Sequence, residues 1–175
     1  MIGKRQHLIN LLVVLIINIT IGYSQTNFEE KAISYFCTDI IKEISVIENI
    51  DIVFKGYTNG HPAKVYDVAD CLGDINLIKD SIPIRHILDD LEKKLSEMKF
   101  NKRKIDIPCD RFKKKVLLKK DVFYMTVYES IQYKGSNIVE IFLLNRKRQM
   151  YVIVIVEFDD ANQVSNFCTR HIRYE

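Results

Sequence analysis

Histidine has the side-chain pKa nearest neutrality, so its positions are the first candidates for acid, base or metal-ligand chemistry. Beyond the first 24 residues the chain has three: His61, His86 and His171. His86 stands four residues before Asp90 on the polar side of an expected helix, which is typical of a solvated pair. His61 lies in a Gly-His-Pro turn. We therefore retain only His171, in the last apolar stretch, as a catalytic candidate.

The carboxylates do not complete a recognised catalytic or metal motif. Asp159 and Asp160 are adjacent, and adjacent residues of a strand point in opposite directions, so they are better explained as turn formers. Asp67, Asp70 and Asp74 lack the ligand density and glycine placement of a calcium loop. The sequence has no HExxH zinc motif, nucleophile elbow or phosphate-binding glycine loop. We expect no cofactor and no metal, and an enzymatic role stays open without being favoured.

The clearest charge feature is residues 93–120, which hold 12 Lys or Arg against three acidic residues. Such a cluster suits an anionic partner, for example a phosphorylated lipid or an acidic protein surface. The alternative is a solvated face whose lysines balance acidic regions elsewhere in the fold. Nucleic acid is not expected, because aromatic interleaving is limited to Phe100 and Phe112. The candidate patch comprises Lys102, Arg103, Lys104, Arg111, Lys113, Lys114 and Lys115.

Residues 1–24 have the layout of a secretory signal peptide, with Lys4 and Arg5 ahead of an uncharged run and a small-residue ending at Ser24. The competing interpretation is a membrane anchor. The uncharged run, however, would reach only about 21 Å as a helix, short of the roughly 30 Å hydrocarbon core. We expect cleavage before Gln25 and no transmembrane segment in the mature chain. The product would be a secreted or periplasmic protein in which residues 25–175 form a single domain.

Export changes the interpretation of the four cysteines, Cys37, Cys71, Cys109 and Cys168. An even number in an oxidising compartment suggests up to two disulfides, and four separate thiols are the alternative. No spacing forms a CxxC redox or zinc pattern. Cys37 falls on the apolar side of an expected helix, whereas Cys71 and Cys109 lie in loop-like sequence. We therefore expect a disulfide between Cys71 and Cys109.

Two amphipathic helices are expected in the first two thirds of the chain. Residues 27–45 place apolar side chains every three or four positions, with Asn27 as the cap. Residues 82–98 repeat this pattern behind a capping serine and a first-turn proline. Between them, Asn59 and Gly60 separate two strand-like runs, which predicts a hairpin.

The last third of the chain predicts strands joined by short polar turns, and such connections join antiparallel neighbours. The expected fold is therefore α+β: an N-terminal helix, a hairpin, a second amphipathic helix, and a curved four-stranded antiparallel meander packed on the helices. The four expected strands are residues 122–133, 138–144, 150–158 and 164–173.

One of these strands is apolar at seven successive positions, residues 150–156. Alternate side chains of a strand point to opposite faces, so both faces of this strand must be covered. Leaving three or four of them in water would forgo about 1.5 to 3 kcal/mol each. The helices would cover one face. The other requires a curved sheet that closes on itself, a partner subunit or a ligand.

The order of these elements, with the closing turn "VEFDDANQVSNF", resembles the NTF2-like (cystatin-like α+β) superfamily. Members of that superfamily form a cone-shaped sheet around a pocket and include enzymes, carriers and dimerisation modules. The resemblance therefore implies a pocket and leaves the function open. Its enzymes usually place an Asp and a His in the pocket, and neither role can be assigned to a specific residue here.

Two hypotheses follow. The first, which we favour, is an exported small binding or interaction module that holds an unknown small apolar ligand or a protein partner. A second copy of the chain, paired through the sheet as a homodimer, is one form of such a partner. The alternative is a small envelope hydrolase or isomerase of NTF2-like shape that uses His171.

Overall fold

The computed structural model describes residues 27–60, 65–74, 84–113 and 121–174, and these form an α+β fold, as expected. The strands are β1 (Asp51–Asn59), β2 (Phe112–Lys113), β3 (Val122–Tyr128), β4 (Ile131–Tyr133), β5 (Ser136–Asn145), β6 (Met150–Phe158) and β7 (Val164–Arg173). The helical elements are α2 (Phe28–Tyr35), the π-helical turn η1 (Phe36–Ile40), α3 (Ile41–Glu43), the 3-10 turn η2 (Ser45–Ile47), α4 (Val65–Asp74) and α5 (Ile84–Glu97).

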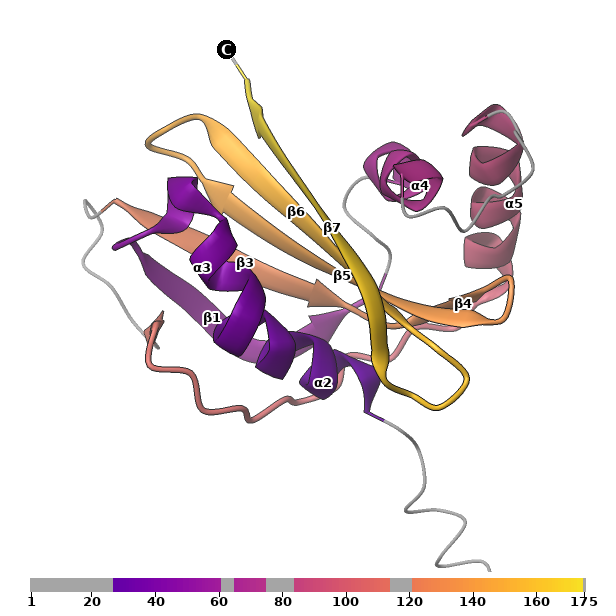
Figure 1. The fold of residues 1–175 in the computed structure, drawn as a ribbon, viewed down its shortest axis with the longest axis horizontal. Coiled ribbons are helices and arrows are strands. Elements are labelled where there is room, and N and C mark those ends of the chain that lie inside the picture. The colour runs from indigo at the N-terminus through magenta and orange to yellow at the C-terminus, as the bar shows by residue number, and fades with distance from the viewer. Residues whose placement is uncertain (1–26, 61–64, 75–83, 114–120, 175) are drawn as a thin grey trace, which may run out of the picture.

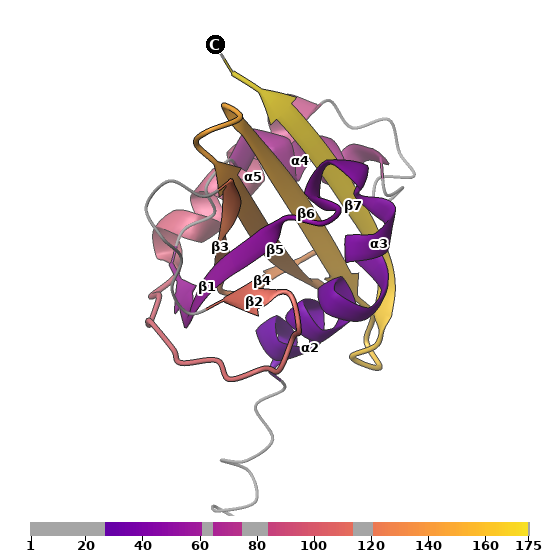
Figure 2. The same ribbon diagram turned by 90° about the vertical axis from the view of Figure 1, so that its left-hand side faces the viewer.

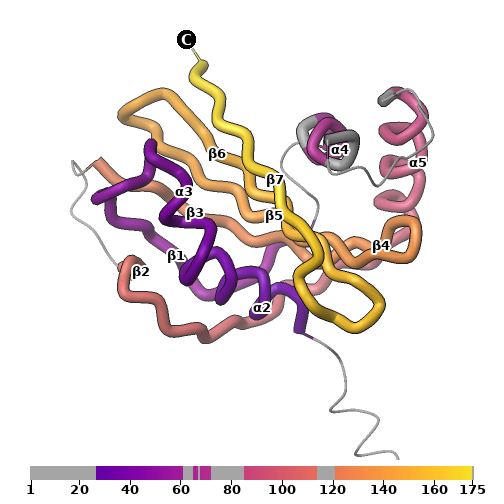
Figure 3. The backbone as a smooth tube through the Cα atoms, in the orientation of Figure 1, coloured from indigo at the N-terminus to yellow at the C-terminus, as the bar shows by residue number. Residues whose placement is uncertain are grey.

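The strands form one mixed sheet in the order β2-β1-β3-β5-β6-β7, with β4 paired to β5. From β3 onward all pairs are antiparallel, so the expected meander is present, with its first strand divided into β3 and β4. The expected sheet of four strands is too small, because β1 and β2 extend it. β1 runs parallel to both β2 and β3, and a parallel pair requires a long crossover, which here contains α4 and α5. Figure 1 shows the resulting arrangement, and Figure 3 traces the chain along it.

The expected hairpin at Asn59 and Gly60 is wrong, because the chain enters the helix α4 soon after β1. Residues 61–64, which would form the rest of the turn, lie outside the described residues. The apolar positions Val65, Val68 and Ala69 follow the helical spacing of three and four, and Val68 and Ala69 are buried. Their packing on the sheet and on α5 overrides the local strand-like pattern.

Both expected helices are confirmed within a few residues of their predicted bounds. Asn27 caps α2, since its Oδ1 accepts a hydrogen bond from the Glu30 backbone N–H at 3.2 Å. The helical run continues through η1 and α3 and buries one apolar stripe against the sheet, which includes Ala32, Ile33, Phe36 and Ile40. α5 covers Ile84–Glu97, whereas its expected serine cap lies outside the described residues.

Both faces of β6 are covered, as its sequence requires. Val152, Val154 and Val156 pack in one core with the N-terminal helical run, whereas Ile153 and Ile155 pack in a second core with α4 and α5. Figures 1 and 2 show the two helical layers on opposite sides of the sheet. The expectation that the helices share one face is therefore wrong. The apolar run is explained by two helical layers without a partner or a ligand.

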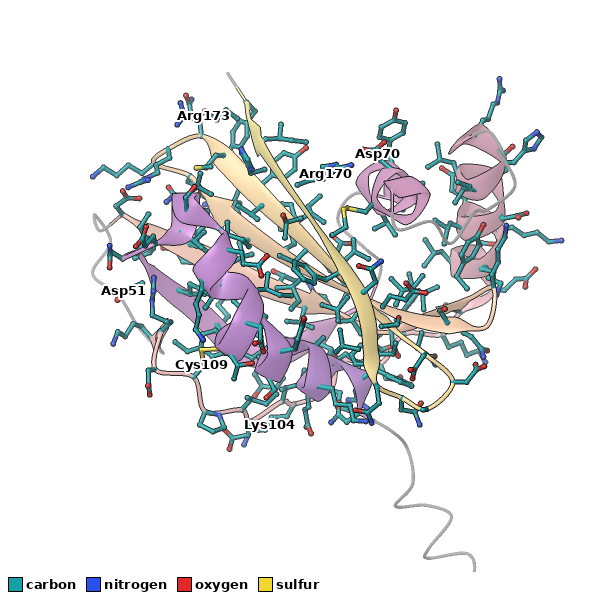
Figure 4. The ribbon with its side chains drawn as sticks, in the orientation of Figure 1. Asp51, Asp70, Lys104, Cys109, Arg170 and Arg173 are labelled. Carbon is teal, nitrogen blue, oxygen red and sulfur yellow. A yellow bond between two sulfur atoms is a disulfide. The ribbon has the colours of Figure 1, made fainter. Side chains whose placement is uncertain are left out.

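The expected disulfide between Cys71 and Cys109 is also wrong. The structure pairs Cys37 with Cys109, and Cys71 with Cys168, with Cα–Cα distances of 6.1 and 5.7 Å. Cys71 and Cys168 belong to the core under α4 and α5, whereas Cys37 packs against the core on the other face of the sheet. Cys109 lies beside the N-terminal helical run (Figure 4), so the sheet separates it from Cys71. Two disulfides are typical of an oxidising compartment.

Among the described residues, no helix is long and apolar enough to cross a bilayer.

The disulfide pairing can be tested by proteolysis of the unreduced protein followed by mass spectrometry of the linked peptides. We expect peptides that join Cys37 to Cys109 and Cys71 to Cys168. Replacing both Cys71 and Cys168 by alanine should lower the free energy of unfolding by about 2 to 5 kcal/mol, because the bond closes a long loop in the unfolded chain. A peptide joining Cys71 to Cys109 would contradict this pairing.

Candidate functional site

One face of the sheet is covered over only part of its area. Residues directly opposite each other on neighbouring strands share a face, so the pairing register defines rows of side chains across the sheet. One row on the α4 side ends at Cys168, which is bonded to Cys71 of α4. A second row crosses β7 four residues further along, at Ile172. It continues through Tyr151, Leu144 and Tyr124 on the neighbouring strands. This second row is at the surface, and Tyr124 is 42 % exposed.

Aromatic rings gather on this open part of the face. The Phe142 and Tyr151 ring centroids are 5.5 Å apart, and the Tyr151 and Tyr174 rings stack at 6.4 Å. Tyr57, from β1, is 45 % exposed. Exposed aromatic side chains offer a large apolar area with a polar tip, which is typical of binding surfaces. The open part of the face is therefore the first candidate for a functional site.

A hollow of about 510 Å³, which we call the sheet groove, lies over β1, β3 and β5 in this area. Its volume falls within the range of about 300 to 1,000 Å³ that is usual for ligand pockets. Its floor and walls combine aromatic, aliphatic, neutral polar and cationic side chains. The described residues that line it are Val53, Lys55, Tyr57, Asn59, Lys102, Tyr124, Met125, Thr126, Phe142, Leu144 and Arg146.

The electrostatics of the sheet groove have one sign. Lys55, Lys102 and Arg146 contribute three cations, and none of the described lining residues is acidic. The Lys102 Nζ lies 4.8 Å from the centroid of the Tyr57 ring, a cation–π distance that holds the ammonium group over the aromatic face. None of these three cations takes part in an ion pair within the described part of the chain. Their charge is therefore available to an anionic ligand.

An irregularity in β1 places Lys55 and Tyr57 in the groove. Between its pairings with Met125 and Val127 of β3, β1 advances four residues while β3 advances two, so β1 bulges. Gly56 makes the bulge possible, because its φ is +74° and a Cβ there would meet the Ile105 carbonyl oxygen at 3.0 Å. The bulge thus depends on a residue without a side chain.

The segment that carries Lys102 is fixed to β1 by backbone hydrogen bonds. The Thr58 N–H donates to the Arg103 carbonyl and the Ile105 N–H donates to the Gly56 carbonyl, both at 2.8 Å. The Arg103 N–H in turn donates to the Thr58 hydroxyl at 2.8 Å. Residues 103–105 therefore lie alongside β1 at the edge of the sheet, which holds the neighbouring Lys102 over Tyr57.

An ion pair between the half-buried Arg103 and a buried carboxylate ties the same segment to the first turn of α2. The Arg103 guanidinium contacts Glu29, whose side chain is 4 % exposed, and also donates to Asn27 Oδ1 at 2.9 Å. The other oxygen of Glu29 accepts a hydrogen bond from the Ser130 N–H at 2.7 Å. A carboxylate near a helix N-terminus is further favoured by the helix dipole. Glu29 therefore joins three parts of the chain beside the groove.

Two buried polar residues, one on β3 and one on β5, lie close to each other. Tyr128 is 9 % exposed and Glu140 is 3 % exposed. Burial, together with the nearby Glu140 carboxylate, raises the pKa of Tyr128 to about 12. The hydroxyl therefore stays protonated at physiological pH. Tyr128 pairs with the groove residue Asn59 across β1 and β3 and does not itself line the groove.

The basic patch predicted from the sequence has several separate roles. Arg103 pairs with Glu29, and the Arg111 Nη2 donates to the carbonyls of Ile47 and Ile50 at 2.8 and 2.9 Å. Both arginines thus stabilise the fold. Lys102 lines the sheet groove, and Lys104 and Lys113 are exposed nearby. Lys114 and Lys115 lie outside the described residues. As a single anion-binding surface, the patch stays a prediction.

Neither His171 nor His86 lines the sheet groove. His171 is exposed on β7, beside a cavity of about 120 Å³ that Glu43, Ser45 and Thr169 also line. Ligand pockets are usually at least about 300 Å³, so this cavity would hold only a small group. His86 is exposed on α5, whereas His61 lies outside the described residues. In the described ranges no three His, Cys, Asp or Glu side chains gather as metal ligands.

Comparison with family models, with curated proteins and with solved structures finds no match to this chain.

Sequence reasoning missed most of the groove. The alternation in β3 places Tyr124 and Thr126 on one face, and this signal was available. Lys55 and Tyr57 depend on the β1 bulge, and Arg146 lies in a turn, so none of these three positions follows from a periodic pattern. Of the groove residues, only Lys102 belongs to the predicted patch.

Replacing Arg103 by glutamine should lower the free energy of unfolding by about 1 to 3 kcal/mol, because the buried Glu29 carboxylate loses its charged partner. Chemical denaturation of the variant provides the measurement. Adding Glu29→Gln to the same protein should restore part of the loss, since no buried charge then remains unpaired. Equal stability of wild type and Arg103→Gln would show that the pair does not hold the segment.

The raised pKa of Tyr128 should make stability fall at high pH. Its contribution is complete below the unfolded pKa near 10 and is lost as the pH rises toward 12, at a cost of about 1 kcal/mol by pH 11. The free energy of unfolding should therefore fall less between pH 9 and pH 11 in Tyr128→Phe than in wild type, as measured by chemical denaturation. The exposed Tyr57→Phe is the control. Identical pH dependence in all three proteins would contradict the assignment.

Proposed function

We propose that this chain is an exported binding module that holds an anionic ligand in the sheet groove. The observation that carries the proposal is the convergence of Lys55, Lys102 and Arg146 around exposed aromatic rings. The described lining residues include no carboxylate to neutralise them. Charge-assisted hydrogen bonds to such cations are about twice as strong as neutral ones, so an anion is the complementary ligand.

This proposal changes the ligand class expected from the sequence. A purely apolar ligand was inferred from β6, whose two faces are covered by helices. The groove on β1, β3 and β5 is amphipathic, and its rings suit a ligand that has an apolar part as well as a charge. A homodimer through this face is less favoured, because it would place the cations of one copy near those of the other.

Export and family membership belong to the same proposal. The signal-like residues 1–24 and the two disulfides both support an oxidising destination, such as the periplasm or the exterior. The N-terminal helical run and the closing meander support an NTF2-like relationship. In this relationship the sheet groove would be the ligand site on the sheet.

The alternative role, a hydrolase or isomerase that uses His171, has less support. The small size of the cavity beside His171 argues against a bound substrate, and the sheet groove contains no histidine among its described residues. A binding role needs only the geometry and charge described above. We therefore keep the enzymatic reading second.

The proposal can be tested with anilinonaphthalene sulfonate, an aromatic anion whose fluorescence rises on binding. We expect the wild type to bind the dye and the double variant Lys55→Gln, Arg146→Gln to bind it about fivefold more weakly, because two exposed charge contacts are lost. The control is Lys42→Gln, Lys93→Gln, which changes the net charge equally on exposed lysines of α3 and α5.

The dye titration is accompanied by native mass spectrometry of the protein purified from an oxidising compartment. Equal dye affinity in both double variants would contradict binding in the groove. A stable dimer that excludes the dye would replace the proposal with pairing through the sheet.

A further inference from the structure

A second hollow, which we call the segment hollow, adjoins the sheet groove and shares Lys102 with it. It has a volume of about 860 Å³ and lies between the start of α2, residues 99–104 and the connection from β3 to β4. Two further lysines, Lys99 and Lys104, line it. Figure 4 shows Lys104 at the edge of the fold, near the start of α2. The two hollows therefore adjoin at Lys102, and lysines line both of them.

Apart from Arg103, the cations that line the two hollows form no ion pair with the residues that the structure describes. Within the described ranges, none of Lys99, Lys102 and Lys104 lies in an ion pair. The segment hollow does contain Glu29 and Glu129, and both are engaged. Glu29 binds Arg103, and the Glu129 Oε1 accepts a hydrogen bond from the Asn101 N–H at 3.0 Å. With Lys55 and Arg146, five cations that form no ion pair among the described residues line the two hollows.

We propose that the ligand is an acidic polysaccharide whose chain runs from the sheet groove into the segment hollow. This inference rests on the proposed function and names its ligand class. Cations spread over two adjoining hollows match a ligand with repeated negative charges better than a single carboxylate. Neutral polar side chains in both hollows, such as Asn59, Thr126 and Asn162, complement sugar hydroxyls. The exposed ring of Tyr124 can stack on a sugar ring.

Three other occupants fit the surface less well. An acidic peptide would bury backbone groups against a sheet face whose own backbone is already paired, and unpaired buried groups are costly. A second copy would bring like charges together. Single-stranded nucleic acid needs aromatic rings for successive bases. Among the described residues that line the segment hollow, Phe28 alone is aromatic, and it already packs on Phe158.

The test measures binding of fluorescent heparin fragments to the mature protein with its disulfides intact. We expect a decasaccharide to bind at least tenfold more tightly than a disaccharide. The variant Lys99→Gln, Lys104→Gln should bind the decasaccharide about tenfold more weakly than wild type does. Its affinity for the disaccharide should fall by less than about twofold, since the short chain fills only the sheet groove. Lys42→Gln, Lys93→Gln is the matched control and should bind as wild type.

A second set of probes separates the sugar from the charge. Polyphosphate of equal charge and an oligothymidine replace the decasaccharide at the same salt concentration. Tyr124→Leu should lower the affinity for the decasaccharide about fivefold and leave the affinity for polyphosphate unchanged, because only a sugar stacks on the ring. If polyphosphate or the oligothymidine binds more tightly than the decasaccharide, the polysaccharide proposal is wrong.

The two levels of the proposal fail separately. If the dye binds in the sheet groove but saccharide affinity does not depend on chain length, the polysaccharide proposal is wrong and the anion site stands. Loss of both dye and decasaccharide binding would remove the proposed function as well.

Discussion

Burial of β6 on both faces is the constraint on which the rest of the fold depends. The side chains from Val152 to Val156 are fully buried, which requires a separate apolar layer on each side of the sheet. At about 1.5 to 3 kcal/mol for each side chain, this burial is comparable with the whole stability of a typical domain. The N-terminal helical run supplies one layer and the pair α4 and α5 supplies the other. Each disulfide then joins a helical layer to another part of the chain.

The candidate site arises because the second helical layer covers only part of its face of the sheet. α4 is bonded at Cys71 to the row of Cys168, and it packs on β6 and β7. The row of Tyr124 lies four residues further along the strands, or about 13 Å away. α5 lies toward β4, where the Lys94 Nζ donates to the Gln132 carbonyl at 2.7 Å. Neither helix therefore covers the aromatic row, and this part of the sheet is left to solvent or to a ligand.

Much of the fold could be predicted from the sequence, whereas little of the site could be. The helices at residues 27–45 and 82–98 and the strands after residue 122 have strong periodic patterns, and all are present. The hairpin after Asn59 failed because helical and strand spacing overlap in a short apolar run, and tertiary packing decided between them. The disulfide pairing failed because it depends on which face of the sheet each cysteine occupies, which no local pattern encodes.

The same reasoning explains why the basic segment gave a misleading picture of the surface. Counting charges between residues 93 and 120 treats Arg103 and Arg111 as equivalent to the lysines around them. The guanidinium group forms several directed hydrogen bonds, and here both arginines use it on buried partners, a carboxylate and two backbone carbonyls. The lysines carry a flexible point charge, and those of the segment that the structure describes are exposed. The arginines therefore position the segment, and the lysines that it carries, together with Lys55 and Arg146 from the sheet, supply the charge that a ligand would meet.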